Sequence, residues 1–257
     1  AGTASLNLTF TEIVSTGINT LKYATVNGNA GNDTITLGDQ ISAFAGSLVA
    51  GGAGNDIVGT YNWGSGNATT GLSTAGQVQD IMSGNTINGG AGNDTVFVNY
   101  SGGNSARQNT LNGNAGNDSV SFSSTSAAFF TGLIGGGQGE DTIYATFRSG
   151  DGWSINGGAG NDSITFQGLG PASTGLIQGD TTNTQAGNDT ISITFSGTSA
   201  TTVQGLAGAD SIYISASTAG GANVIAGNGG NDTITFHTAG MQANNFSAWT
   251  VNGGAGA

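Results

Sequence analysis

The aspartates of this chain have the type and spacing to do chemistry, because most of them follow the same short phrase. One copy is GGAGNDTV at residues 89–96, and near copies recur along the sequence. Each copy combines one carboxylate with the backbone carbonyls of a glycine-rich turn, so its donor atoms are oxygens. An oxygen-only set suits a hard cation. A softer metal or a catalytic centre would need other residues, and the chain has no cysteine and only one histidine, His237.

Charge and composition exclude several classes of protein. The chain has 257 residues, with 15 acidic and 3 basic side chains and a net charge of −12. This charge repels nucleic acid and anionic lipid and attracts cations. No run of about 20 apolar residues is present, so we expect no membrane insertion. The 49 glycines do not fall at every third position, as they would in collagen, and apolar residues recur in order between them.

The phrase repeats at a nearly constant distance. Its copies begin at Gly28, Gly51, Gly89, Gly113, Gly136, Gly157, Gly179, Gly205, Gly227 and Gly253. The steps are 21 to 26 residues long except for one of 38, which holds an insertion at about residues 60–83. A fixed period in this range is typical of a solenoid, in which each unit buries its face only against its neighbours. We therefore expect one repeat domain over residues 1–257.

Apolar and polar residues alternate on both sides of each phrase. Val96 and Val98 follow the aspartate in one copy, as Ile164 and Phe166 do in another, and Ile87 precedes the phrase in the same phase. A period of two predicts half-buried strands. The fold is thus expected to be all-β: a parallel β-solenoid with coils of about 22 residues and one glycine-rich turn per coil. Ten coils stacked at about 4.8 Å would form a rod of about 50 Å.

The phrase resembles the calcium-binding nonapeptide of RTX (hemolysin-type) proteins, G-G-x-G-x-D-x-U-x. The resemblance covers nearly the whole chain. RTX β-rolls usually carry the motif at both turns of a coil, whereas only one turn per coil carries it here. The resemblance therefore implies calcium along one edge only. This one-sided layout is similar to the calcium-loaded β-roll segments of very large bacterial adhesins, some of which bind ice.

The spacing indicates which residues would hold calcium. The opening glycines permit positive φ and a tight turn with inward carbonyls, and the aspartate at the sixth position adds an anionic oxygen. Calcium takes about six to eight oxygens, more than one turn offers, so adjacent coils must share each ion. We predict several Ca²⁺ ions in one row, with these metal-site residues: Asp33, Asp56, Asp94, Asp118, Asp141, Asp162, Asp189, Asp210, Asp232, Gly28, Gly51, Gly89, Gly113, Gly136, Gly157, Gly205 and Gly227.

A metal-free alternative exists for the same pattern. Each aspartate could cap its own turn through an Asx hydrogen bond, while the asparagines form a ladder. Carboxylates about 5 Å apart repel by about 3 kcal/mol at an effective dielectric constant of about 20, and asparagine alone would form that ladder without the repulsion. Calcium is therefore favoured. The fifth position, which tolerates Glu140 and Ala209, is expected to face solvent, and weaker sites are expected at Asp141, Asp210 and the split Asp180/Asp189 unit.

Three classes of function fit these features. The first is an extracellular structural or adhesive protein, non-catalytic and located at the cell surface: a surface layer, sheath, filament or adhesin stalk. The second is the calcium-binding RTX domain of a larger secreted enzyme or toxin, which a longer gene with a non-repeat catalytic region would indicate. The third is an ice-binding β-roll. The third is disfavoured because alanine, as at Ala91 and Ala115, occupies the turn position where that family has threonine.

The two ends of the chain predict continuation or self-association. Residues 1–8 align with the second half of the phrase, as in residues 115–122, and residues 251–257 stop one residue before an aspartate is due. Both ends are thus unfinished coils with exposed strand edges. Either the sequence belongs to a longer array of repeats, or copies of the chain stack end to end and complete one another's coils.

Overall fold

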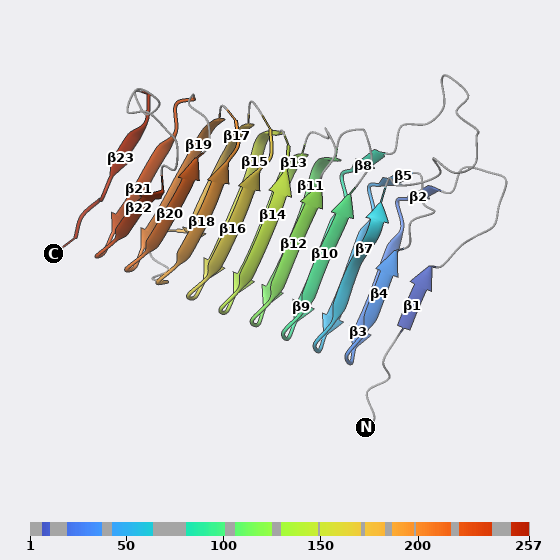
Figure 1. Cartoon of the computed structure of the whole chain (residues 1–257). Helices are drawn as coiled ribbons and strands as arrows, with labels where there is room; N and C mark the ends of the chain where they lie inside the picture. Colours follow the sequence, from blue (N-terminus) through green and yellow to red (C-terminus); the bar gives the residue numbers. More distant parts are fainter. Residues whose placement is uncertain are drawn as a thin grey trace, which may run out of the picture.

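The computed structural model describes residues 7–10, 20–37, 43–63, 81–100, 106–124, 130–148, 150–170, 173–182, 187–197, 199–216, 221–237 and 248–256. These residues form a parallel β-solenoid, as predicted, and successive coils follow one another along a rod from the N-terminal to the C-terminal end (Figure 1). No helix with the length and apolarity of a membrane span occurs among them.

Two parallel sheets face each other across the core. The first has ten strands, in spatial order β1 (Asn7–Phe10), β4 (Thr34–Leu37), β7 (Ile57–Trp63), β10 (Thr95–Tyr100), β12 (Ser119–Ser124), β14 (Thr142–Phe147), β16 (Ser163–Gly168), β18 (Thr190–Phe195), β20 (Ser211–Ala216) and β22 (Thr233–His237). The second has thirteen strands: β2 (Thr20–Lys22), β5 (Ala43–Ala45), β8 (Ile81–Ser83), β11 (Ala106–Ala115), β13 (Phe130–Gln138), β15 (Gly150–Ala159), β17 (Ser173–Asp180), β19 (Ser199–Ala207), β21 (Val224–Gly229) and β23 (Thr250–Asn252), with β3 (Thr25–Ala30), β6 (Leu48–Ala53) and β9 (Thr86–Ala91) beside them.

The second sheet bends in its first coils, and this bend was not predicted. There the strand before each phrase is divided in two, as in β8 and β9, whereas both of these segments pair with the single strand β11. The strand also runs further than predicted, since β9 includes the first three residues of the phrase, 89–91. The glycine-rich turn proper is therefore short, and it connects the second sheet directly to the first.

In-register stacking places equivalent residues of successive coils side by side. Val96 pairs with Val120, and Val98 pairs with Phe122. At the N-terminal end, Leu8 pairs with Ile35. The alignment of residues 1–8 with residues 115–122 had predicted that Leu8 lies opposite Leu37, two residues further along β4. A shift of two residues keeps the same side chains on the same face of a strand, so the alternation alone could not fix this register.

The core includes the apolar residues that the alternation predicted to face inward. Val96, Phe122 and Ile164 are completely or almost completely buried. In the middle coils the core widens into a stack of aromatic rings, in which Phe122 and Phe130 have centroids 4.4 Å apart and Trp153 and Phe166 have centroids 4.7 Å apart. The last coil differs, because Val251 is 50% exposed although its equivalents in the middle coils are buried.

Candidate metal row at the glycine-rich turns

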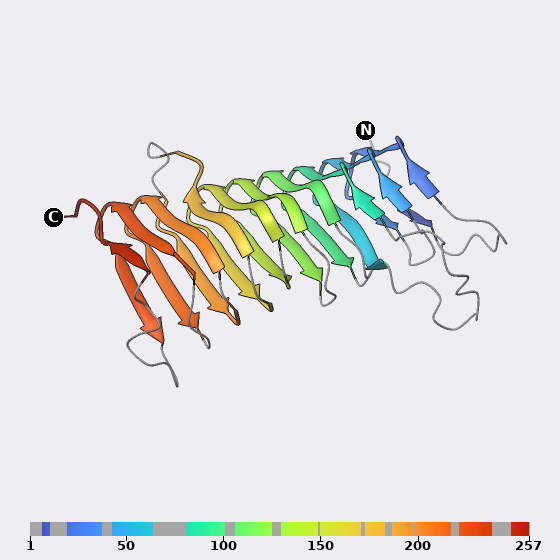
Figure 2. The ribbon, with the colours of Figure 1, turned by 90° about the horizontal axis from the view of Figure 1, so that it is seen from above.

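The glycine-rich turns lie one above another and form a continuous edge of the rod, which runs along the lower side in Figure 1; Figure 2 shows the rod from above. Gly90, near the end of β9, and Gly92, in the turn that follows, both have φ of 127°. A Cβ atom at either position would collide with the backbone of the preceding coil. Glycine is therefore required at these positions by conformation and by space.

The first glycine of the phrase differs in conformation from the glycines that follow it. We predicted that the opening glycines permit positive φ, and the second and fourth positions adopt it whereas the first does not. A Cβ atom on Gly89 would lie 2.5 Å from Asp94 Oδ2 and 2.8 Å from the carbonyl oxygen of Gly113. The first glycine thus leaves room for a carboxylate oxygen of its own coil and a carbonyl oxygen of the next coil to approach each other.

All nine predicted aspartates come together in one row along this edge, which we call the acidic row: Asp33, Asp56, Asp94, Asp118, Asp141, Asp162, Asp189, Asp210 and Asp232. All are almost completely buried except Asp232 in the last complete turn, which is partly buried. Each links to the adjacent coil in the same way. The Asp94 N–H donates to Asp118 Oδ1 over 2.7 Å, and the Asp118 N–H donates to Asp141 Oδ1 over 2.7 Å. The carboxylates therefore cap the neighbouring coil, not their own turn as the metal-free alternative supposed.

The second carboxylate oxygen in the row lacks such a partner. It is buried and accepts no hydrogen bond at the following positions: Oδ2 of Asp56, Asp94, Asp118, Asp141, Asp162, Asp189, Asp210 and Asp232. A buried anionic oxygen without a partner is strongly unfavourable unless it is protonated or binds a cation. Among the described residues no three acidic or histidine side chains converge to enclose an ion, so a cation here would also need backbone carbonyl oxygens.

Burial shifts the protonation of these acids. Desolvation raises the pKa of Asp94, Asp118, Asp141 and Asp162 to about 6, against a hydrogen bond from the backbone that lowers it, and repulsion from neighbouring acids adds to the increase. The pKa of Asp189 rises furthest, to about 7, for the same reasons. Desolvation and charge repulsion both penalise the ionised carboxylate, and a bound cation would relieve both.

The residues at the fifth position face solvent, as predicted. Asn55, Asn93 and Asn117 are exposed, and so are Glu140 and Ala209. The asparagines form a ladder of their own, in which the Asn93 N–H donates to Asn55 Oδ1 over 2.9 Å and the Asn117 N–H donates to Asn93 Oδ1 over 2.9 Å. The predicted asparagine ladder therefore exists, but beside the acidic row and not in place of a metal site.

Sequence reasoning missed a second ladder of buried polar side chains at the bend of the second sheet. We call Ser47, Asn85 and Asn109 the corner row. The Ser47 N–H donates to Asn85 Oδ1 over 3.1 Å, and the Asn85 N–H donates to Asn109 Oδ1 over 3.2 Å. All three side chains are at most 3% exposed. These residues lie outside the phrase, each four residues before its first glycine, and the mixture of serine and asparagine at this position was not recognised as a row.

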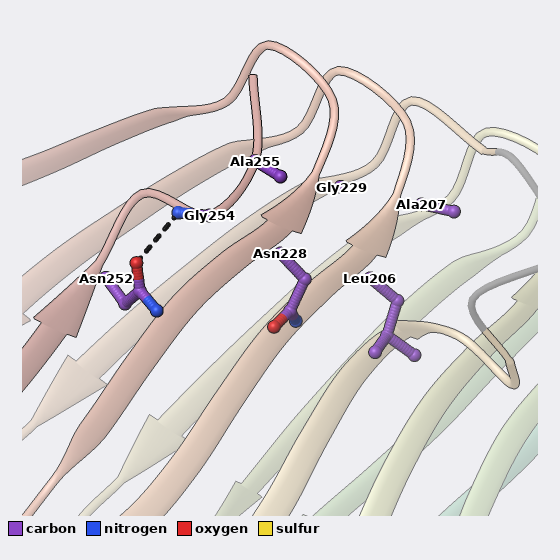
Figure 3. A pocket seen from close by; sticks show the side chains of 7 residues that line it. All are labelled: Leu206, Ala207, Asn228, Gly229, Asn252, Gly254 and Ala255. Atoms are coloured by element: carbon purple, nitrogen blue, oxygen red, sulfur yellow. Dashed lines mark hydrogen bonds between the residues drawn. The ribbon is translucent and has the colours of Figure 1, made fainter.

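A groove of about 520 Å³ lies near the C-terminal end of the rod (Figure 3). Its lining consists of Leu206, Ala207, Asn228, Gly229, Asn252, Gly254 and Ala255. Asn252 Oδ1 accepts a hydrogen bond from the Gly254 N–H at 2.9 Å, within the wall of the groove. No charged or nucleophilic side chain lines it, so the groove adds no chemistry to that of the acidic row.

Comparison with known families agrees with this geometry. The family described as RTX calcium-binding nonapeptide repeat (4 copies) matches residues 25–40, 83–99, 105–123, 154–166 and 217–236. The glycine-rich turns within these segments are RTX calcium-binding repeats. RTX repeats bind Ca²⁺ at several sites along a β-roll, and the buried carboxylate oxygens, the adjacent carbonyls and the absence of nitrogen or sulfur donors in these turns fit that ion. No curated protein and no solved structure matched the chain.

The acidic row and the carbonyl oxygens beside it are the groups of this chain that would hold calcium. Bound calcium would supply positive charge at the oxygens that have no other partner. The individual ligands predicted from the sequence, including the first glycines, stay predictions, although the structure brings the carbonyl of Gly113 close to Asp94 Oδ2 around Gly89.

Proposed function

We propose that this chain is an extracellular, calcium-stabilised structural or adhesive rod of the cell surface, such as part of a surface layer, sheath, filament or adhesin stalk, and that it is not catalytic. The observation that carries the proposal is the row of buried carboxylate oxygens without hydrogen-bond partners along the rod. Such a row opposes folding where calcium is scarce and supports folding where it is abundant. RTX repeats are typical of secreted proteins that meet calcium outside the cell.

The architecture supports a structural role. The two sheets and the glycine-rich edge account for almost all described residues, and each coil contacts mainly its neighbours. A protein of this kind keeps the same cross-section along its length, which suits a spacer or a lattice element. The larger secreted enzyme or toxin, the ice-binding role and the end-to-end association remain predictions from the sequence.

Calcium removal tests the proposal. Far-ultraviolet circular dichroism and thermal melting should be recorded in millimolar calcium, in excess EDTA, and in EDTA with magnesium restored. We expect EDTA to lower the melting temperature strongly or to abolish the β signal, and magnesium to restore little of it, because magnesium demands stricter geometry and loses its water reluctantly. Unchanged melting in EDTA would show that the rod does not depend on calcium.

Light scattering of the intact chain with calcium present addresses the predicted association. Growth of the particle mass with protein concentration is expected if copies stack end to end. A monomer that persists at high concentration would contradict stacking of isolated chains.

A further inference from the structure

Next to the turn between β17 and β18 lies a second buried acid, Asp180, at a position where no other copy of the phrase has an acid. Asp180 ends β17 and pairs in register with Gly158, the second residue of its phrase. The second residue is glycine or asparagine in most coils, as at Gly90 and Asn114. The Asp180 side chain is 0% exposed, so it lies inside the rod and not in the solvent at its edge.

One carboxylate oxygen of Asp180 accepts hydrogen bonds from backbone N–H groups where the pairing between strands stops. The pairing of β17 with β19 ends at Gln178 and Gln204, whereas neighbouring strand pairs continue into the phrase. Beyond that point Asp180 Oδ2 accepts hydrogen bonds from the N–H of Ala207 at 3.3 Å and the N–H of Gly187 at 3.5 Å. A neutral asparagine could accept the same bonds, so this role does not explain a buried charge.

The other oxygen points to a ligand. Asp180 Oδ1 is buried without a hydrogen-bond partner, and so is Oδ2 of Asp189, the acid of the same coil. Asp180 lies beside the segment that leads to Asp189, because a Cβ atom on Gly187, two residues before Asp189, would meet Asp180 Oδ1 at 3.1 Å. The Gly205 carbonyl oxygen of the next coil lies near Asp189 Oδ2, since a Cβ atom on Gly179 would meet both.

We propose that Asp180 and Asp189 bind one calcium ion together, with the Gly205 carbonyl among its further ligands, and that this is the tightest site of the rod. The proposal rests on the proposed calcium-dependent function. Calcium affinity increases with the number of charged ligands and with the rigidity of the site. The split turn supplies two buried carboxylates from a single coil, where other coils supply one. This reverses the expectation from sequence, which placed the split unit among the weaker sites.

The substitution Asp180→Asn separates the ligand role from the backbone role. It keeps an oxygen acceptor for Ala207 and Gly187, and it installs the residue type already present at the equivalent position in Asn29, Asn114 and Asn228. Calcium titration calorimetry should show the tightest binding step weakened at least about tenfold, with the weaker steps unchanged. The control is Glu140→Gln, which also removes one negative charge from this edge, but at an exposed position; it should leave the tightest step unchanged.

The outcomes separate this proposal from the proposed function. If the unsubstituted chain binds no calcium, both fail. If it binds calcium and Asp180→Asn keeps the same tightest step, or if Glu140→Gln weakens that step equally, the Asp180 site is overturned while the calcium-dependent rod stands. A crystal structure of the unsubstituted chain grown with calcium is independent of variant folding. An ion within about 2.6 Å of oxygens of both Asp180 and Asp189 supports the site, and an ion row that bypasses Asp180 contradicts it.

Discussion

The acidic row and the corner row solve the same problem with different chemistry. In both, a side-chain oxygen of one coil accepts the N–H of the coil before it: Asp118 Oδ1 from Asp94 at 2.7 Å, and Asn109 Oδ1 from Asn85 at 3.2 Å. Both rows are buried. The corner row achieves this with neutral groups. Backbone capping therefore needs no charge, and the charge of the acidic row must serve another purpose, which cation binding supplies.

The rows also differ in their remaining polar atoms. In the corner row, Asn85 Nδ2 donates to Asn109 Oδ1 over 3.0 Å, so the second group of the amide is used within the row. In the acidic row, Oδ2 of Asp94 and Asp118 has no such partner. The corner row thus satisfies the polar atoms named here by hydrogen bonds within the row, whereas the second carboxylate oxygens of the acidic row need a cation.

The largest effect is expected when a charge is placed in the corner row. Asn109→Asp keeps the acceptor for the Asn85 N–H but buries a carboxylate that has no cation site around it. We expect a loss of about 3–5 kcal/mol in the free energy of unfolding at pH 7, which added calcium should not restore. Urea denaturation in calcium measures it. A variant as stable as the parent chain, or one rescued by calcium, would remove the distinction between the rows.

A smaller loss in the free energy of unfolding is expected when a methyl group is added at the first glycine of a phrase, next to the acidic row. In Gly89→Ala the new methyl group meets Asp94 Oδ2 and the Gly113 carbonyl, so we expect a loss of about 1–3 kcal/mol and weaker calcium binding. Gly253→Ala is the matched control, because it changes the same first position of the last phrase, where a Cβ atom meets nothing within 4 Å. Equal losses in the two variants, measured by thermal melting, would contradict the packing role of the first glycine.

Neutralising one acid should have an effect whose sign depends on calcium. Asp118→Asn keeps the acceptor for the Asp94 N–H, as the corner row does, and removes one charge. Without calcium we expect a gain of about 1 kcal/mol, because repulsion and desolvation are relieved. With calcium at about 100 times its dissociation constant, the loss of one site should cost about 2 kcal/mol. Melting curves in EDTA and in calcium test the reversal, and a change of the same sign in both would contradict it.

The pH dependence should be the smallest effect for any single acid, and the corner row should produce none. The pKa of Asp118 is about 6 in the folded chain, above its ordinary value of 3.8, so between these values the folded state holds more protons than the unfolded state. The calcium-free rod should therefore be most stable at acidic pH and lose stability as the pH rises from about 4 to about 7. We expect each such acid to lower the melting temperature by a few degrees between pH 5 and pH 7.5. A rise over this range, or an unchanged slope in Asp118→Asn, would contradict this assignment.

The sequence predicted the fold well because the repeat imposes both phase and stacking. Alternation around residues 95–98 and 119–122 sufficed to place their apolar side chains in the core. The acidic row followed from the position of one residue type within each copy. Both features belong to the repeating unit, so each of the ten near copies of the phrase gives independent support for them.

What the sequence did not predict depends on single coils or on contacts between coils. Asn85 and Asn109 meet only because the second sheet bends at that place, and neither lies in the phrase. The approach of the Gly113 carbonyl to Asp94 Oδ2 around Gly89 is a relation between two coils, which no one copy reveals. Asp180 was visible as an interruption, but its complete burial depends on how the interrupted turn closes.

The confinement of the carboxylates to one edge has a mechanical consequence for a rod of this shape. Repulsion between neighbouring acids lengthens only the edge that carries them, while the corner row holds its own coils at a fixed spacing. A beam with one edge longer than the other must curve. Calcium, by drawing the acidic edge together, would straighten the beam and resist its bending toward the opposite side. The calcium concentration around the rod would then set its shape and stiffness as well as its stability.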